Sequence, residues 1–286
     1  MGCCSFLGDE PRKHGQARTR WTLDGLGAVV PEFAGASRSG ILRVLANYRL
    51  RWKRGRDHLR SPDPLYQEEL ARLATIRTQV ETSSLGAVRL HLDEVTYYRQ
   101  PSIGYGYAPA GSAEPQAERS LRSDSTTRVI GTLDAATGRV ISRQQAKIGV
   151  PALIRFFRDL AAAYPGQRIY LGLDTRPVHF HPDVLAALEP QTSPFPFFRP
   201  PSWSPDPSPR AKRLTLPLQL VPLPTYAPWA NPFEKLWRWL KQDVLHPHRL
   251  ADDLPALHSL VLDFLARFKD GSNDLLRYVG LPYRRN

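Results

Sequence analysis

The order of hydrophobic and polar positions divides the chain into a short helical region and a longer region in which strands and helices alternate. In the first region, apolar residues that recur every three or four positions predict one helix from Thr22 and a second helix from Ser37 or Ser39. A third helix over 65–80 leads into the second region. The predicted parts are a helical domain, a helical linker and a larger mixed domain, at 1–64, 65–84 and 85–286.

The second region contains several runs in which apolar residues alternate or recur with helical spacing. Alternation predicts four strands, of which the second and third form a hairpin: 87–95, 126–134, 139–147 and 168–174. Helical spacing predicts four helices: 151–163, 181–188, a strong helix from Asn231, and 252–268. Asn231 is the expected N-cap of the third of these, with Pro232 in the first turn.

Between these elements the composition changes sharply. Thirteen of the 27 prolines lie between positions 190 and 232, which is too dense for a regular helix or a central strand. The segment 190–230 is therefore predicted to be an insertion or an extended loop, with a short strand over 218–223.

The charge of the chain suggests a polyanionic partner. The chain carries 39 Lys and Arg against 27 Asp and Glu, a net charge of +12. Twelve basic and five acidic residues lie in the first 60 positions. Such an excess favours a nucleic acid or an acidic membrane surface, although a solvated basic arm has the same charge pattern.

The first two helices, with a tight turn between them, are typical of a helix-turn-helix DNA-binding module, although any small helical hairpin looks similar. The second helix places basic residues on its polar face, and a basic segment follows in which Arg and Lys alternate with apolar residues. The residues predicted to contact DNA are Arg38, Arg43, Arg51, Lys53, Arg54 and Arg56.

Several other classes of protein do not fit the composition. Only Cys3 and Cys4 are present, so neither a disulfide framework nor a cysteine zinc site is expected. No run approaches the ~18 apolar residues of a membrane span, and Phe6 stands where a myristoylation motif needs Ser or Thr. The two H-x-H pairs that begin at His179 and His246 do not favour a zinc site without cysteine. We expect a cytoplasmic protein with no membrane partner.

Three carboxylates mark the predicted chemistry. Asp93 and Asp174 end two predicted strands, and Glu234 lies in the first turn of the helix from Asn231. Neighbouring strands lie ~5 Å apart, so two strand-end carboxylates can share a pair of Mg²⁺ ions with a third acid. Such a metal pair cleaves phosphodiester bonds. Spacing alone leaves other interpretations open, because acids at element ends also serve as caps or ion-pair partners, and three further acids compete: Glu94, Asp124 and Asp134.

The order strand, hairpin, helix, strand with Asp and helix with Glu is similar to the ribonuclease-H-like fold. Three segments carry a closer resemblance: LHLDE at 90–94, LDTRPVHFHPDV at 173–184 and LPTYAPWANPFEKLWRWLK at 223–241. With these, the chain resembles the DDE transposases of the insertion-sequence-630 group, which are relatives of the mariner elements, over about residues 20–282. The third segment matches the family motif LP-x-Y-[SA]-P-x-x-NP-[IF]-E.

The resemblance implies the following fold and function. The fold would be α/β, with a ribonuclease-H-like catalytic domain whose mixed sheet is flanked by helices, preceded by an all-α helix-turn-helix module. Asp93, Asp174 and Glu234 would be the catalytic residues and would hold two Mg²⁺, for which Mn²⁺ can substitute. The protein would bind the terminal inverted repeats of an insertion sequence as a homodimer on double-stranded DNA. It would cleave them and join the freed ends to target DNA at TA dinucleotides, in the bacterial cytoplasm and in association with the nucleoid.

Three departures from the family pattern keep two alternatives open, a catalytically silent DNA-binding relic and a nuclease that cuts without joining. Thr175 stands where the family has Asn after the second Asp. Asp174 and Glu234 are 60 positions apart, a spacing that the proline-rich segment lengthens. Relatives also carry another helix-turn-helix before the one predicted here, so the N-terminus is expected to be shortened.

Overall fold

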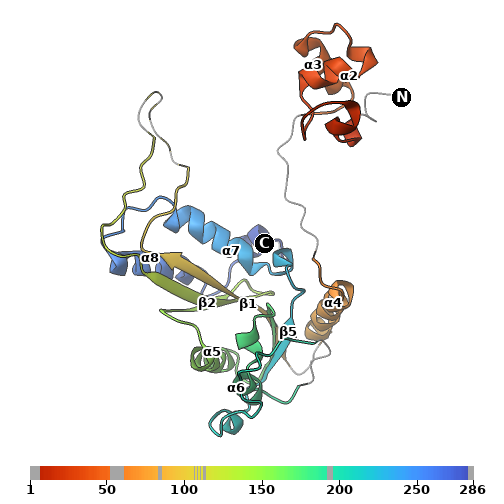
Figure 1. Cartoon of the computed structure of the whole chain (residues 1–286). Coiled ribbons are helices and arrows are strands. Elements are labelled where there is room, and N and C mark those ends of the chain that lie inside the picture. Colours follow the sequence, from red (N-terminus) through yellow and green to blue (C-terminus); the bar gives the residue numbers. More distant parts are fainter. Residues whose placement is uncertain are drawn as a thin grey trace. The chain divides into compact units, whose positions relative to one another are not determined.

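A computed structural model of the chain describes residues 7–51, 61–82, 86–105, 107, 109, 111, 114–191 and 196–282. The chain divides into two compact units, Met1–His58 and Leu59–Asn286, which are drawn in Figure 1. The helix assigned to a linker from the sequence, α4 (Tyr66–Thr82), contacts the first strand of the second unit.

The first unit is built around two short helices, α2 (Leu23–Val29) and α3 (Arg38–Asn47). Thr22 Oγ1 accepts a hydrogen bond from Gly25 N at 3.1 Å, and Ser37 Oγ accepts one from Gly40 N at 3.1 Å. These hydroxyls satisfy backbone donors that the first turns leave open, so the predicted helix starts are confirmed, with Ser37 as the second cap. The small core of this unit consists of Leu26, Val30, Phe33 and Ile41.

The second unit contains a five-stranded mixed sheet in the order β3-β2-β1-β4-β5. On one side of β1 the pairing with β2, and of β2 with β3, is antiparallel; on the other side β4 and β5 run parallel to it. The strands are β1 (Ala87–Tyr98), β2 (Thr126–Asp134), β3 (Val140–Gln145), β4 (Arg168–Leu173) and β5 (Leu218–Pro222). The predicted mixed sheet and the predicted short strand within the proline-rich segment are thus confirmed.

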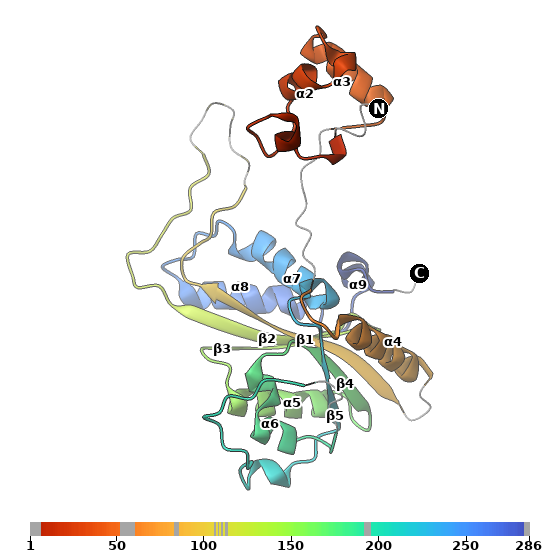
Figure 2. The ribbon, with the colours of Figure 1, turned by 45° about the vertical axis from the view of Figure 1, so that its right-hand side comes forward.

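Helices cover both faces of the sheet (Figure 2). One face packs against α5 (Val150–Ala163) and α6 (Pro182–Ala186), and the other against α7 (Phe233–Leu240) and α8 (Leu254–Ala266). Successive side chains of a strand point to opposite faces, so Leu90 and Leu92 of β1 join the core under α5, whereas Val95 and Tyr97 join the core under α7. Asp93 shares the parity of Val95 and therefore lies on the α7 face.

Strand β1 continues beyond Asp93, the residue at which the sequence pattern predicted its end. Its pairing with β4 stops at the His91–Gly172 pair, but its pairing with β2 continues as far as Tyr98, opposite Thr126. The prediction that Asp93 ends its strand is therefore wrong. Asp93 lies inside β1, at the point where the parallel neighbour ends and leaves one side of the strand open.

Two further helical segments close the second unit. Helix α7 is followed by a π-helical turn, Lys241–Leu245. The last helix of the described residues is α9 (Asn273–Val279), which the sequence pattern did not predict. Ser272 Oγ accepts from Leu275 N at 3.1 Å and Gly280 has a φ of 83°, so α9 has a cap at each end. A helix of seven residues has only about two turns, which is too few for a repeating apolar pattern to identify it from the sequence.

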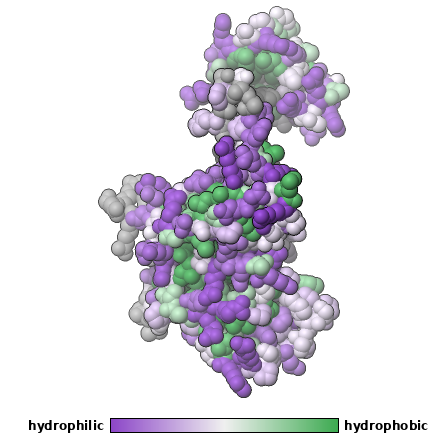
Figure 3. Space-filling view, turned by 90° about the vertical axis from the view of Figure 1, so that its left-hand side faces the viewer, coloured by the Kyte–Doolittle hydropathy of each residue, from purple (hydrophilic) through white to green (hydrophobic). Residues whose placement is uncertain are grey.

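The surface agrees with the polar composition of the chain. Hydrophilic residues predominate on the face shown in Figure 3, with smaller hydrophobic patches between them. Of the helices in the described ranges, none combines the length and the apolar character that crossing a membrane requires.

A buried carboxyl group in α4 gives a testable pH dependence. Glu69 is 4% exposed, and burial, together with the charge of Asp63, raises its pKa from 4.5 to about 7. A group with a raised pKa in the folded state contributes stability at low pH and loses it as the pH rises through that pKa. Glu69→Gln is expected to raise Tm relative to wild type at pH 8 and to leave it nearly unchanged at pH 4.5. Glu68→Gln, at an exposed neighbouring position, is the control, and an equal shift for Glu69→Gln at both pH values would contradict the argument.

Candidate active site

Asp93 is a half-buried carboxyl group, and one of its oxygens has no hydrogen-bond partner among the described residues. Its Oδ1 accepts a hydrogen bond from Glu94 N at 2.8 Å, whereas Oδ2 is buried and has no hydrogen-bond partner among the described residues. Burial, followed by the charge of Glu234 and then that of Asp174, raises the pKa of Asp93 to about 7. The site therefore destabilises the ionised form of Asp93 unless a positive charge is present.

Asp174 follows the last residue of β4 and is held by its own downstream segment. Its Oδ1 lies 2.9 Å from His179 Nδ1 and accepts a hydrogen bond from Arg176 N at 3.3 Å. Burial acts to raise the pKa of Asp174, but the hydrogen bond and charge of His179 outweigh it and lower the pKa. Asp174 is thus an ionised carboxylate fixed at one oxygen.

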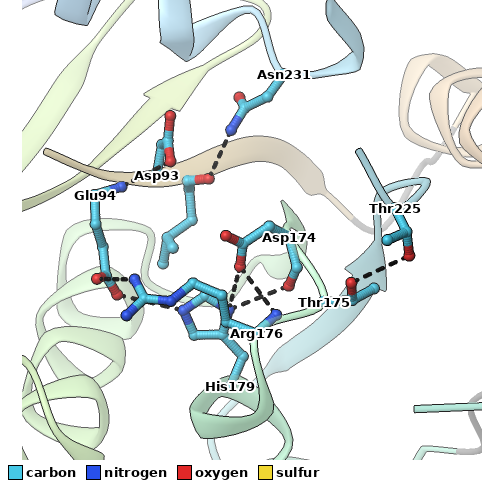
Figure 4. A network of polar contacts seen from close by, with 9 residues as sticks. Asp93, Glu94, Asp174, Thr175, Arg176, His179, Thr225 and Asn231 are labelled. Carbon is cyan, nitrogen blue, oxygen red and sulfur yellow. Dashed lines mark hydrogen bonds and ion pairs between the residues drawn. The ribbon is translucent and has the colours of Figure 1, made fainter. Parts of the chain in front are cut away.

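Glu234 lies in the first turn of α7, and Asn231 positions this turn against β1. Asn231 Nδ2 donates to Leu92 O at 3.0 Å (Figure 4). Its Oδ1 accepts from Phe233 N at 3.1 Å. The N-cap is Pro232, one residue later than predicted, but the Asn231 side chain satisfies a first-turn donor as a cap would. Burial, with the charge of Asp174, raises the pKa of Glu234, while Lys241 and Arg238 oppose this effect.

The three acids line one cavity of about 190 Å³, together with residues 223–228 and with Thr175 and Asn231. In the described ranges, no group of three or more His, Cys, Asp or Glu residues is already arranged around a single metal position. Even so, the side chains suit a divalent cation. Asp93 Oδ2 has no hydrogen-bond partner among the described residues, the charges of neighbouring carboxylates raise the pKa values of Asp93 and Glu234, and hard cations prefer oxygen ligands.

Glu94, the neighbour that competed with Asp93, has a different position. Its Oε2 lies 2.5 Å from Arg176 Nη1 and its Oε1 lies 3.4 Å from His179 Nε2 (Figure 4). Both oxygens of Glu94 are thus engaged by residues of the segment that follows β4. These contacts indicate that Glu94 supports the site by holding Arg176 and His179.

His179 connects the carboxylates of Asp174 and Glu94, a role that no pattern in the sequence indicates. The imidazole is 1% exposed and contacts Asp174 through Nδ1 and Glu94 through Nε2. Burial acts to lower its pKa, but the two carboxylates outweigh it and raise the pKa to about 9. His181, the other half of the H-x-H pair, instead accepts from Asp183 N at 3.1 Å and caps α6, so the pair serves two separate structural purposes.

The remaining acidic candidates lie elsewhere. Asp134 Oδ1 accepts from Ala136 N at 2.8 Å in the β2–β3 turn, and Asp124 Oδ1 accepts from Gln100 N at 3.3 Å in the β1–β2 connection. Neither residue lines the cavity that contains Asp93.

The absence of a side chain at Gly131 allows α7 to lie close to the sheet. Gly131 pairs with Asp93 across the β1–β2 ladder, and a Cβ there would lie 2.8 Å from Phe233 Cζ and 3.4 Å from Trp237 Cη2. Because Glu234 follows Phe233, this close approach also fixes the distance of Glu234 from the sheet.

Gly131→Ala is therefore expected to destabilise the fold by about 1–3 kcal/mol, the usual cost of inserting a methyl group into a packed core. Urea denaturation of the full chain measures this free energy of unfolding. Gly8→Ala is the control, because a Cβ at Gly8 meets nothing within 4 Å. A Gly131→Ala protein as stable as wild type would show that α7 can move away without cost.

The predicted DNA-contacting residues lie in the first unit or just after its described part. Arg38 Nε and Nη2 bind Asp24 Oδ1 and Oδ2 at 2.7 and 2.5 Å on the surface. Arg43 and Arg51 are exposed. The three other predicted residues lie outside the described residues: Lys53, Arg54 and Arg56.

The strand order, the helices on both faces and the three acids in one cavity define a ribonuclease-H-like protein with a carboxylate site. The sequence matches the profile described as DDE superfamily endonuclease over residues 88–258, more than half of the chain. The chain belongs to this family, and the resemblance noted from the sequence is confirmed.

Individual relatives agree with the family. The chain is 23% identical over 246 residues to an insertion element IS630 uncharacterized 39 kDa protein of Shigella sonnei, covering 84% of this chain and 63% of that protein. The chain thus spans less than two thirds of this relative. Its fold is similar to the Mos1 mariner paired end complex with Mg (TM-score 0.55, 16% identity, 95% of this chain and 82% of that chain). It is also similar to the Mos1 strand transfer complex (TM-score 0.54, 15% identity, 93% and 76%).

Proposed function

We propose that the chain is a DNA transposase of the insertion-sequence-630 and mariner type. The observation that carries the proposal is the single cavity into which a central strand, the end of a parallel strand and a helix start each bring one carboxylate: Asp93, Asp174 and Glu234. Family membership and the likeness to Mos1 complexes support it.

In this proposal the three carboxylates hold two divalent cations, Mg²⁺ or Mn²⁺. When bound, such a pair activates a water and stabilises the leaving oxygen of a phosphodiester. Asp93 offers its unpartnered Oδ2, and Asp174 is held ionised by His179. Attack of water on phosphorus breaks the P–O3′ bond and leaves a 5′-phosphate and a 3′-hydroxyl. In the joining step this 3′-hydroxyl attacks a phosphodiester of the target and displaces a 3′-hydroxyl of the target strand.

The first unit is proposed to bind the terminal inverted repeats as a helix-turn-helix module. Helix α3 presents Arg38 and Arg43, and the following basic segment, from Arg51 through Lys53, Arg54 and Arg56, contacts the phosphate backbone. Arg38 would exchange its surface contact with Asp24 for DNA, which costs little because exposed ion pairs are weak. Paired cutting of two ends, and insertion at TA dinucleotides, would require a homodimer on double-stranded DNA.

The proposal is tested by incubating the full chain with a labelled duplex that carries the inverted repeat found beside its own gene, in Mg²⁺, Mn²⁺ or EDTA. Metal-dependent cutting at the repeat end, followed by joining to a TA-containing target plasmid, is the expected result. Cutting without joining would identify a nuclease. Binding without cutting would identify a silent DNA-binding relic, and absence of both would reject the proposal.

A further inference from the structure

Tyr226, at the rim of the carboxylate cavity, has an unfavourable backbone conformation. It is the third residue of a turn closed by a hydrogen bond from Ala227 N to Pro224 O at 3.2 Å, and its φ is 54°. Turns with a positive φ at this position normally use Gly or Asn. A bulky aromatic residue with positive φ is uncommon and is maintained only where the surroundings enforce it.

Neighbouring side chains hold this turn from two directions. Thr225 N donates to Asp63 Oδ2 at 2.9 Å, and Ser61 Oγ donates to Thr225 O at 2.6 Å. On the other side, Thr225 Oγ1 lies 3.4 Å from Thr175 Oγ1, next to Asp174 (Figure 4). The residues before α4 and those after β4 therefore fix the backbone immediately before Tyr226.

Packing does not account for the tyrosine. Its side chain is 76% exposed, so little apolar area of Tyr226 is buried in return for the strain. At the same time Tyr226 lines the cavity with Asp93, Asp174 and Glu234. The fold thus holds an open aromatic ring beside the proposed reaction centre.

We propose that Tyr226 stacks on the nucleobase next to the scissile phosphate and so positions the DNA strand in the carboxylate cavity. This inference rests on the proposed function. A ring has a flat apolar face that accepts any base, whereas the acidic wall of the cavity would repel a phosphate not neutralised by metal. Base stacking on this ring would hold the strand at the cavity without a further cationic side chain there.

The test uses the cleavage position mapped in the repeat duplex. A 5-iodouracil base is placed in turn on each side of that position, and the full chain is irradiated with the duplex in Ca²⁺, which allows binding without turnover. Mass spectrometry is expected to find the cross-link at Tyr226 in wild type. Tyr226→Phe is expected to keep a cross-link at this position, and Tyr226→Leu to lose it.

Cleavage rates and stability complete the test. The cleavage rates of Tyr226→Leu and Tyr226→Gly in Mg²⁺ are expected to be about 10-fold lower than that of wild type, in line with the usual loss when one stacking residue is removed. Tyr226→Phe should cut at nearly the wild-type rate. Tyr226→Gly should also have a Tm equal to or above that of wild type, because glycine relieves the positive φ. Tyr98→Leu, an exposed tyrosine that does not line the cavity, should match wild type.

Each outcome decides the inference. A wild-type cross-link elsewhere, or Tyr226→Leu cutting at the wild-type rate, overturns the stacking role while leaving the proposed function intact. A Tm for Tyr226→Gly several degrees below wild type would assign the ring to the fold and also overturn it. A wild-type chain that neither cuts nor binds the duplex removes the proposed function, and the stacking role with it.

Discussion

Asp93→Asn is expected to reduce phosphodiester cleavage by about 10³-fold or more, because the loss of one metal ligand removes several kcal/mol of transition-state stabilisation. Binding of the repeat duplex should stay within about twofold of wild type, since the predicted phosphate contacts lie in the first unit. Glu234→Gln should behave in the same way. Gel-based cleavage and a filter-binding assay measure the two quantities on the same preparations.

The same substitution should stabilise the metal-free protein. Asp93 is half-buried beside two other carboxylates and its pKa is raised to about 7, so the ionised form destabilises the folded state above that pH. Asp93→Asn is therefore expected to raise Tm at pH 8 in EDTA while it abolishes cleavage. A gain of stability together with a loss of activity is typical of a functional site whose charges repel one another in the absence of the ligand.

Asp124→Asn is the matched control for this experiment. Asp124 was an alternative candidate on spacing, but it accepts a backbone hydrogen bond in the β1–β2 connection and an asparagine oxygen can do the same. The cleavage rate and the Tm of Asp124→Asn should equal those of wild type. If Asp93→Asn retains cleavage within tenfold of wild type, the reaction centre lies elsewhere.

The three acids could be identified from the sequence because each belongs to a local pattern. Asp174 follows an alternating strand, and Glu234 lies in a motif that contains its own turn, proline and asparagine. Asp93 lies in the same cavity as the other two acids, but the predicted strand end at Asp93 was wrong, since the length of β1 depends on its partners. Only the pairing shows that β4 stops at Gly172 while β2 continues.

Other parts of the site depend on contacts that no local pattern contains. His179 reaches Glu94, 85 positions earlier, and Gly131 makes room for a ring 102 positions later. The positive φ of Tyr226 depends on hydrogen bonds that Ser61 and Asp63 make to the residue before it. Such features follow from the closed fold and not from spacing along the chain.

The long spacing between the second and third acids also has a structural explanation. Between β4 and α7 the chain forms α6, a short 3₁₀ helix (Ala211–Arg213) and the edge strand β5. The last of these returns the chain to the sheet, because β5 pairs in parallel with β4 from Leu218 onward. The prolines therefore lengthen an excursion outside the sheet without changing the order of the strands that carry the acids.

The second large effect is expected at His179. Its imidazole is buried between Asp174 and Glu94, so His179→Ala leaves two carboxylates facing each other without the group that separates and orients them. Partners that orient a ligand typically change metal affinity by about 10–100-fold when they are removed. We expect His179→Ala to weaken Mn²⁺ binding to the full chain by this factor, measured by isothermal titration in the absence of DNA, and to slow cleavage at least as much.

Two conservative variants separate orientation from simple destabilisation. In His179→Asn the side-chain amide can still donate to Asp174, as Nδ1 does, whereas in His179→Gln the longer amide reaches toward Glu94, as Nε2 does. If His179 acts by orienting Asp174, His179→Asn should recover more Mn²⁺ affinity than His179→Gln, although both lose the ring. His181→Asn, at the histidine that caps α6, should leave Mn²⁺ affinity unchanged. Equal Mn²⁺ affinity in wild type and in His179→Ala would instead mean that Asp174 needs no help from the imidazole, and that the buried ring serves only the packing of the segment after β4.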